Sequence, residues 1–155
     1  MLINEQTTTL AVPNFDERLP SVSTTDLINL MRVDKTLGNE RLANAISHAY
    51  QVINGELDRL YPSWFFGGLF NQHLTNFFQP KTPSIDVKST HFVYLYRQAV
   101  LHEATALLCE LHADFDTIGQ GLARADIAKQ DSLRRQVQHF IADMTGKPRN
   151  RITLL

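Results

Sequence analysis

The sequence predicts an all-α fold, a compact bundle of about four helices around one long central helix, with extended arms at both ends of the chain. The central stretch, residues 91–113, contains no Gly or Pro and is rich in Leu, Ala, Glu and Gln. Two further segments repeat apolar residues at helical steps of three and four, whereas no strand pair and no internal repeat is visible. A chain of 155 residues has the length of a single domain, so we expect one hydrophobic core.

The first 22 residues are expected to form an N-terminal arm. They carry β-forming residues, followed by Pro13 and Pro20, and show no helical period. A flexible terminus and a segment that orders against a neighbour are equal alternatives. The helical domain is then expected at residues 23–146, and Ser23 and Asp26 have the spacing of a capping box at the start of a short first helix.

A second helix is predicted from Gly38-Asn39-Glu40 to the residue before Pro62. Its apolar residues follow steps of three and four, as on one face of an amphipathic helix: Leu42, Ile46, Ala49, Ile53, Leu57 and Leu60. Gly55 lies inside this pattern, where it weakens a helix and suggests that another backbone approaches closely.

The central helix is apolar over most of its circumference. Two adjoining rows run along it, one with Val93, Tyr96, Val100, Ala104, Leu107 and Leu111, the other with Phe92, Leu95, Ala99, Ala106 and Cys109. Leu101 and Leu108 add a stripe on the far side. Such a helix has to be covered on all sides, by its own chain or by neighbouring subunits.

An aromatic insertion is predicted at residues 62–85, between the second and the central helix. It has no helical period and contains Gly67-Gly68 and paired prolines. A loop that folds back over the helices is one interpretation, and a ligand pocket or partner surface is the other. Its candidate interface residues are Trp64, Phe65, Phe66, Phe70, Phe77 and Phe78.

The last helix is firmly predicted from Asp131, with Leu133, Val137, Phe140, Ile141 and Met144 on one face. Between residues 117 and 130 the pattern is weaker, and Gly119 and Gly121 loosen its start. Gly146 and Pro148 are a stop signal. Residues 147–155 then form a tail with three basic residues and no acid; a frayed terminus and a segment that adds to a partner's sheet edge or groove are equal alternatives.

Composition and charge exclude several classes of protein. The net charge of -1 argues against a protein that coats nucleic acid. No apolar stretch of about 18 residues predicts a membrane helix, and the first residues lack the pattern of a signal peptide. The single cysteine, Cys109, lies in the apolar helix and is interpreted as a packed hydrophobe, so we expect a cytoplasmic folding environment without disulfides.

No catalytic constellation is evident, so neither an enzyme nor a metal or cofactor site is predicted. His102-Glu103 resembles the start of a zincin motif, but position 106, where the second His would stand, is Ala. An enzyme that uses Glu103 and His102 is the weakest alternative. Glu103 and Glu110 are interpreted as structural carboxylates that need an arginine partner, for which Arg41, Arg134 and Arg135 are available.

Three segments carry a resemblance to a known family. They are LMRVDKTLGNERLANAI (residues 30–46), YLYRQAVLHEATALLCE (94–110) and DSLRRQVQHFIADMTGKPRNRITLL (131–155). In order and spacing they resemble the head completion/stabilisation proteins of contractile-tailed temperate phages, the GPL-type family. The resemblance covers roughly residues 24–61 and 90–155, and the aromatic insertion at residues 62–85 is not part of it.

The resemblance implies a structural virion protein at the neck between head and tail. Such a protein is expected to assemble beneath the portal protein after DNA packaging, as a ring of twelve subunits. There it stabilises the filled head and presents a surface for neck and tail proteins, while DNA passes through the channel without sequence-specific binding. The resemblance assigns portal contact to the tail residues Lys147, Arg149, Arg151, Ile152, Leu154 and Leu155. The alternative is a small helical binding or regulatory protein that uses the aromatic residues 64–78.

Overall fold

The structure, a computed structural model, describes residues 9–60, 85–115 and 120–146. In chain order its elements are β1 (Ala11–Val12), β2 (Val22–Ser23), α1 (Thr24–Met31), the 3-10 helix η1 (Lys35–Leu37), α2 (Asn39–Leu60), α4 (Thr90–Phe115) and α5 (Gln120–Thr145). The predicted all-α bundle around a long central helix is confirmed. None of the described helices is long and apolar enough to cross a lipid bilayer.

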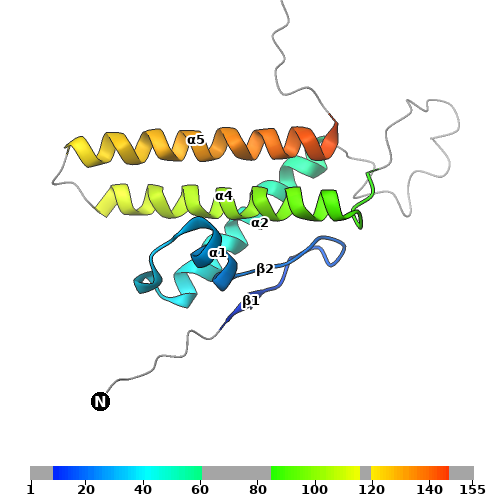
Figure 1. Cartoon of the computed structure of the whole chain (residues 1–155), viewed down its shortest axis with the longest axis horizontal. Helices are drawn as coiled ribbons and strands as arrows, with labels where there is room; N and C mark the ends of the chain where they lie inside the picture. Colours follow the sequence, from blue (N-terminus) through cyan, green and yellow to red (C-terminus); the bar gives the residue numbers. More distant parts are fainter. Residues whose placement is uncertain (1–8, 61–84, 116–119, 147–155) are drawn as a thin grey trace, which may run out of the picture.

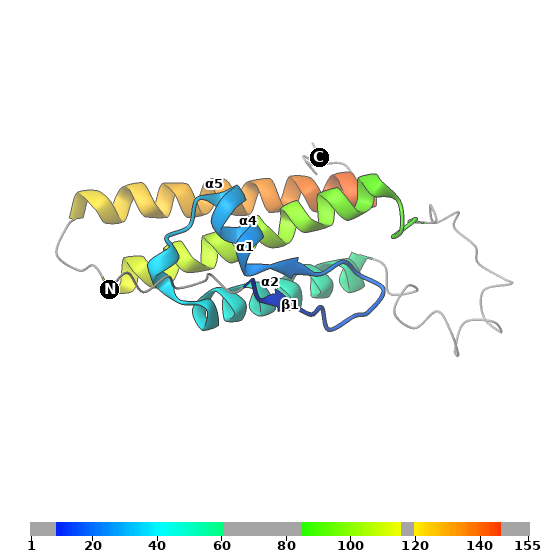
Figure 2. The same cartoon turned by 60° about the horizontal axis from the view of Figure 1, so that its bottom comes forward.

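The central helix α4 is enclosed by the other helices. Figure 2 shows α4 between α5 and α2, and Figure 1 shows α5 alongside α4 over most of its length. Ala99, Val100, Leu101 and Ala104 are all almost completely buried. Successive residues of an α-helix point about 100° apart, so burial of three neighbours in a row means that the middle of α4 is covered over most of its circumference. The chain itself provides this cover.

The helix α2 packs on α4 with the apolar stripe that its sequence pattern predicts. The buried residues of this stripe are Leu42, Ala45, Ile46, Ala49, Tyr50, Ile53 and Leu57. The opposite face, which includes Asn44, His48, Gln51 and Gly55, is exposed. Because α2 is exposed on one side and buried on the other, it forms an outer wall of the bundle.

The segment before α1 departs from the sequence prediction. No strand pair was expected, and this is wrong: β1 and β2 pair antiparallel, with Ala11 opposite Ser23 and Val12 opposite Val22. Val12, Leu19 and Val22 are buried in the common core. The described part of the expected N-terminal arm therefore belongs to the folded body.

Two tyrosines hold this hairpin on the helices. The buried Tyr50 hydroxyl accepts a hydrogen bond from the Val22 amide at 2.6 Å and donates one to the Val12 carbonyl at 3.0 Å, so it bridges both strands. The Tyr96 hydroxyl accepts from Asn14 at 2.7 Å and donates to Asn54 at 2.6 Å. The Asn54 amide donates back to Asn14 at 3.0 Å, which closes the cycle. Burial raises the pKa of both tyrosines, so each hydroxyl keeps its proton.

The predicted capping box at α1 is present and is joined to α4. The Asp26 amide donates to the Ser23 hydroxyl, and the Ser23 amide donates to the Asp26 carboxylate, both at 3.1 Å. Arg97 of α4 adds an ion pair with the same carboxylate at 2.8 Å. One aspartate therefore caps α1 and fixes it to the central helix.

The helix α5 is longer than the firm part of its pattern. It begins at Gln120 rather than Asp131, so the weakly patterned stretch with Gly121 is helical. Gly121 is the second residue of the helix, where a glycine is less unfavourable than in a helix interior. At the other end the predicted stop holds: α5 ends at Thr145, and Gly146 adopts a positive φ of 64°.

We expect Tyr50→Phe to lower the free energy of unfolding by about 2 kcal/mol, because the variant leaves a buried amide and a buried carbonyl without partners. Urea unfolding followed by circular dichroism measures the change. Tyr94→Phe is the matched control, since Tyr94 is 58% exposed and its replacement should be neutral. Equal stability of the two variants would contradict the bridging role of Tyr50.

The cap at Asp26 predicts a pH dependence of stability. Desolvation favours its protonated form, but hydrogen bonds from Ser23 and the charge of Arg97 outweigh this effect and lower the pKa below the ordinary value of 3.8. A lowered pKa means that the carboxylate stabilises the fold above pH 3.8, and that this contribution is lost as the pH falls through the pKa of the folded state. Asp26→Asn should therefore cost about 1 kcal/mol at pH 7 and nearly nothing in strong acid, as measured by urea unfolding at a series of pH values. A difference that persisted in acid would show that the charge is not responsible.

Candidate interaction site

Two groups of predicted site residues lie outside the described residues. These are the tail (Lys147, Arg149, Arg151, Ile152, Leu154, Leu155) and the aromatic insertion (Trp64, Phe65, Phe66, Phe70, Phe77, Phe78). The structure does describe the points at which both segments join the body. Figure 1 shows that the end of α2, the start of α4 and the end of α5 lie at the same end of the bundle. There Ile85 and Phe92 line a hollow of about 270 Å³ together with Met144 and Gly146.

The two predicted structural carboxylates meet one arginine. Arg134 of α5 lies with its guanidinium 2.9 Å from the Glu110 carboxylate and 3.7 Å from that of Glu103. Glu103 is buried, so the arginine offsets a charge that would otherwise be expensive in the core. Of the three arginines that the sequence offered, Arg134 therefore joins α5 to α4, whereas Arg41 and Arg135 are exposed.

The histidine of the incomplete zincin motif has a structural environment. The Nδ1 atom of His102 lies 2.7 Å from the Gln98 carbonyl oxygen, and its ring packs edge-on against Phe140 at 5.1 Å. In the described part of the chain, no three His, Cys, Asp or Glu side chains come together as a metal site requires. The geometry around His102 and Glu103 is thus that of helix packing.

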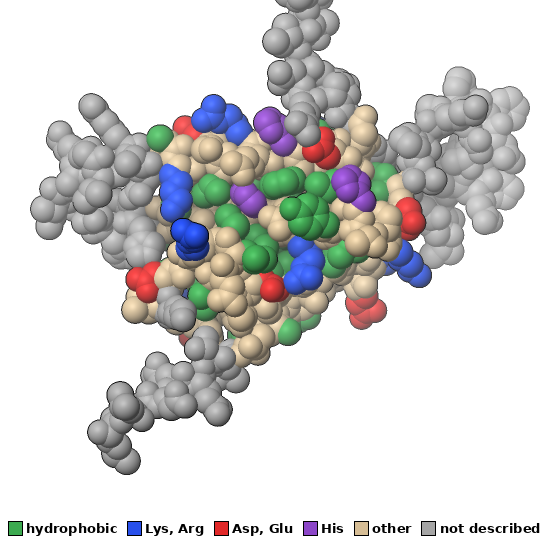
Figure 3. All heavy atoms as spheres, in the orientation of Figure 1, with side chains coloured by type: hydrophobic (Ala, Val, Ile, Leu, Met, Phe, Trp, Pro, Cys, Tyr) green, Lys and Arg blue, Asp and Glu red, His purple; other side chains and the backbone are tan. Residues whose placement is uncertain are grey.

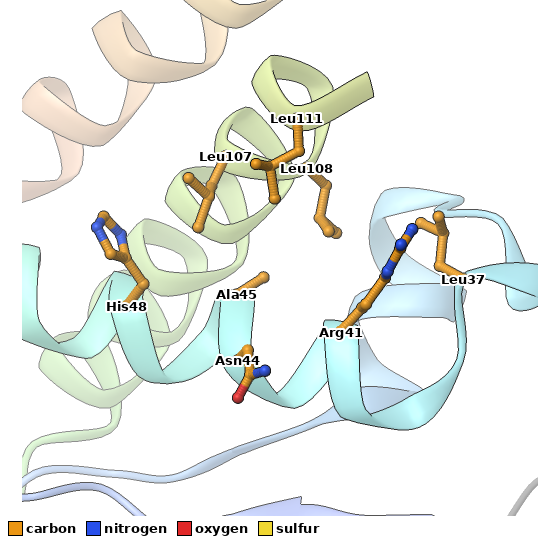
Figure 4. Close-up of a pocket in the computed structure, with 8 residues that line it drawn as sticks. All are labelled: Leu37, Arg41, Asn44, Ala45, His48, Leu107, Leu108 and Leu111. Carbon is orange, nitrogen blue, oxygen red and sulfur yellow. The ribbon is translucent and has the colours of Figure 1, made fainter. Parts of the chain in front are cut away.

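A cavity that the sequence did not reveal lies between the N-terminal half of α2 and the C-terminal half of α4. Its volume is about 470 Å³, and we call it the leucine cavity. Figure 4 shows its lining, which consists of Leu37 from η1, Arg41, Asn44, Ala45 and His48 from α2, and Leu107, Leu108 and Leu111 from α4. The leucines form an apolar floor, and Arg41 and His48 stand on either side of it.

The leucine cavity has the properties of a contact site for an apolar group. Leu111 is 47% exposed, so part of the floor faces water. None of the described lining residues is acidic, and Arg41 supplies a positive charge at the rim. Leu107 and Leu111 belong to the apolar row that predicted a covered central helix. The sequence therefore indicated apolar surface on this helix, but not where a cavity would lie.

A second hollow, of about 700 Å³, lies between the β1–β2 loop and the C-terminal half of α2. Phe15 stands in it with 64% of its surface exposed, next to Asp16 and Glu17 and opposite Asp58. Hydrogen bonds from Arg18 lower the pKa of Asp16, whereas partial burial and the charge of Asp16 raise the pKa of Asp58. We call Phe15 and its acidic neighbours Asp16, Glu17 and Asp58 the Phe15 ridge.

The glycine in α2 borders the Phe15 ridge. Gly55 is exposed, and a Cβ atom added to it would meet nothing within 4 Å in the described part of the chain. The close approach expected from the sequence is therefore not made by these residues.

A further apolar surface, seen in Figure 3 as a band of hydrophobic side chains over α4 between α5 and α1, completes the exposed candidates.

Comparison of the whole sequence with known families identifies the family of this chain. Residues 16–155 match the family model described as phage head completion protein (GPL), whereas no curated protein and no solved structure matches the chain. The matched range covers all four α-helices of the described residues, the aromatic insertion and the tail. This agrees with the resemblance carried by the three helical segments. The chain therefore belongs to the phage head completion protein (GPL) family, a family of structural proteins of the virion.

Proposed function

We propose that this head completion protein acts as a connector adaptor. Copies assemble as a ring, which we propose to be dodecameric, beneath the portal protein once DNA is packaged. The ring prolongs the channel, retains the genome and offers the attachment surface for neck and tail proteins. The observation that carries this proposal is the family match, because it extends through the helical body to the last residue of the tail.

The points at which the two contact segments leave the body indicate how the subunit is oriented relative to the portal. The aromatic insertion leaves the body after Leu60 and returns before Ile85, and the tail begins after Gly146. These points lie at one end of the bundle, so both predicted contact segments start from the same place. We propose that this end faces the portal.

The tail has the chemistry for such a contact. It carries three basic residues and no acidic side chain, and it ends in Ile152-Thr153-Leu154-Leu155. Residues of this kind favour an extended strand that adds to a sheet edge or lies in a groove, with the basic groups next to acidic groups of the partner. We therefore propose that the tail residues contact the portal.

The charge of the chain is compatible with a channel subunit. Its net charge of -1 gives no strong general attraction for phosphates. A ring around the channel should let DNA pass, so tight phosphate binding would be a disadvantage. We propose that DNA passes without sequence-specific contacts.

Binding to the isolated portal ring tests the proposal. Full-length protein should add a ring of density to the portal in electron micrographs, and deletion of residues 147–155 should weaken binding at least about tenfold through lost tail contacts. Deletion of residues 1–8, which lie outside the family match, is the control and should leave binding unchanged.

The two parts of the proposal fail separately in this assay. If folded full-length protein does not associate with a folded portal ring, the connector function is wrong. If the protein binds and the deletion of residues 147–155 has no effect, the function stands and the tail assignment is wrong.

Charge reversal in the tail gives a second prediction. Arg149→Glu and Arg151→Glu should each reduce portal binding, most strongly at low salt, because an attractive contact becomes repulsive. Lys129→Glu, an exposed reversal on α5, is the matched control and should have little effect. Pull-down with the portal at two salt concentrations measures this. An equal loss from all three variants would indicate a general charge effect.

A further inference from the structure

The leucine cavity and the Phe15 ridge are complementary, and one subunit carries both. We propose that two copies of the free protein pair face to face through α2, with Phe15 of each copy in the leucine cavity of the other. The pair is a form of the protein before assembly, and it does not depend on the portal contacts proposed above.

The positions of the two features along α2 indicate a two-fold pair. The exposed residues Asn44, His48, Gln51 and Gly55 follow steps of four, three and four, so they form one stripe. The leucine cavity borders the N-terminal half of this stripe, and the Phe15 ridge borders the C-terminal half. When a projection and its matching cavity lie on one face, two copies satisfy each other by a two-fold rotation, with the same contact made twice.

Phe15 is held in place before any partner arrives. The Asp16 amide donates to the Asn14 side chain at 3.1 Å, and the Leu19 amide donates to the Asp16 carbonyl at 3.0 Å. The ring of Phe15 also rests edge-on against Tyr50, with 6.4 Å between centroids. Because the loop is already ordered, burying this ring in a partner loses little conformational entropy.

Size and charge fit the same occupant. A cavity of about 470 Å³ with a leucine floor has room for a phenyl ring. Beside that ring lie the Asp16–Arg18 ion pair and two further carboxylates, those of Glu17 and Asp58, whereas the rim of the cavity carries Arg41. Insertion of Phe15 would therefore bring acidic groups next to a basic one, which selects this partner and this orientation.

The glycine in α2 is a third, independent observation. A glycine in a helix interior costs about 1 kcal/mol relative to alanine, and this cost is offset where another backbone packs closely on the helix. A Cβ atom added to Gly55 would meet nothing within 4 Å in the described part of the chain, and Gly55 stands on the exposed stripe beside the Phe15 ridge. A second copy that packs on this stripe would have its backbone close to Gly55.

Charge reversal and mixing test the pair directly, by sedimentation velocity of the purified chain. The wild type should sediment as two copies, and Phe15→Ala as one, with association weakened at least about tenfold. Glu17→Arg and Arg41→Glu should each be monomeric alone. In an equal mixture they should pair again, because both contacts of the mixed pair then join opposite charges. Tyr94→Ala, which removes an exposed aromatic from another helix, is the control and should pair like the wild type.

Three results would overturn the proposal. One is a wild type that stays monomeric at all accessible concentrations. Another is a mixture of the two charge variants that does not pair. The third is a Phe15→Ala variant that associates like the wild type. Portal binding is measured separately, so none of these results decides the connector function.

Discussion

The need to cover a helix that is apolar on almost every side governs this structure. Most of the circumference of α4 is buried in its middle, and α5, α2 and α1 together provide this cover. The polar side chains of α4 then fix the position of each neighbouring element through specific contacts. Tyr96 reaches the hairpin and α2 through two asparagines, Arg97 reaches the cap of α1, and Glu103 and Glu110 reach Arg134 of α5. The partly exposed ion pairs of Arg97 with Asp26 and of Arg134 with Glu110 add little stability each, so we interpret them as contacts that fix orientation, whereas Arg134 also offsets the buried charge of Glu103.

The helices could be predicted because their information is local. Steps of three and four mark α2 and α4 without any knowledge of their neighbours, and a Ser23–Asp26 spacing marks the start of α1. The hairpin could not be predicted, because strands of two residues have no period to detect. They are held instead by contacts between distant residues, such as Asn14 with Tyr96. The early start of α5 was missed because Gly121 weakened the pattern there, although it is only the second residue of the helix.

Some features of the interaction surfaces could likewise be predicted from sequence, whereas others depend on tertiary packing. The pairing of Glu103 with an arginine followed from the rule that a buried carboxylate needs a partner, and Arg134 was one of the named candidates. The leucine cavity arises where Leu107 and Leu111 continue the apolar row of α4 beside the outer stripe of α2, which only the packing of two helices can reveal. The exposure of Phe15 likewise depends on a loop conformation. The tail and the aromatic insertion remain predictions from sequence, to which the structure adds their common point of departure.

Both predicted contact segments depart from one end of the helical body, which is compatible with the connector role that we propose. We propose that this protein occupies the portal vertex of DNA-filled heads. Cryo-electron microscopy of filled heads from infections with and without the protein tests it most directly. We predict a ring of helical density beneath the portal in the first sample and its absence, with loss of DNA, in the second. Identical portal vertices and equal DNA retention in the two samples would contradict the account.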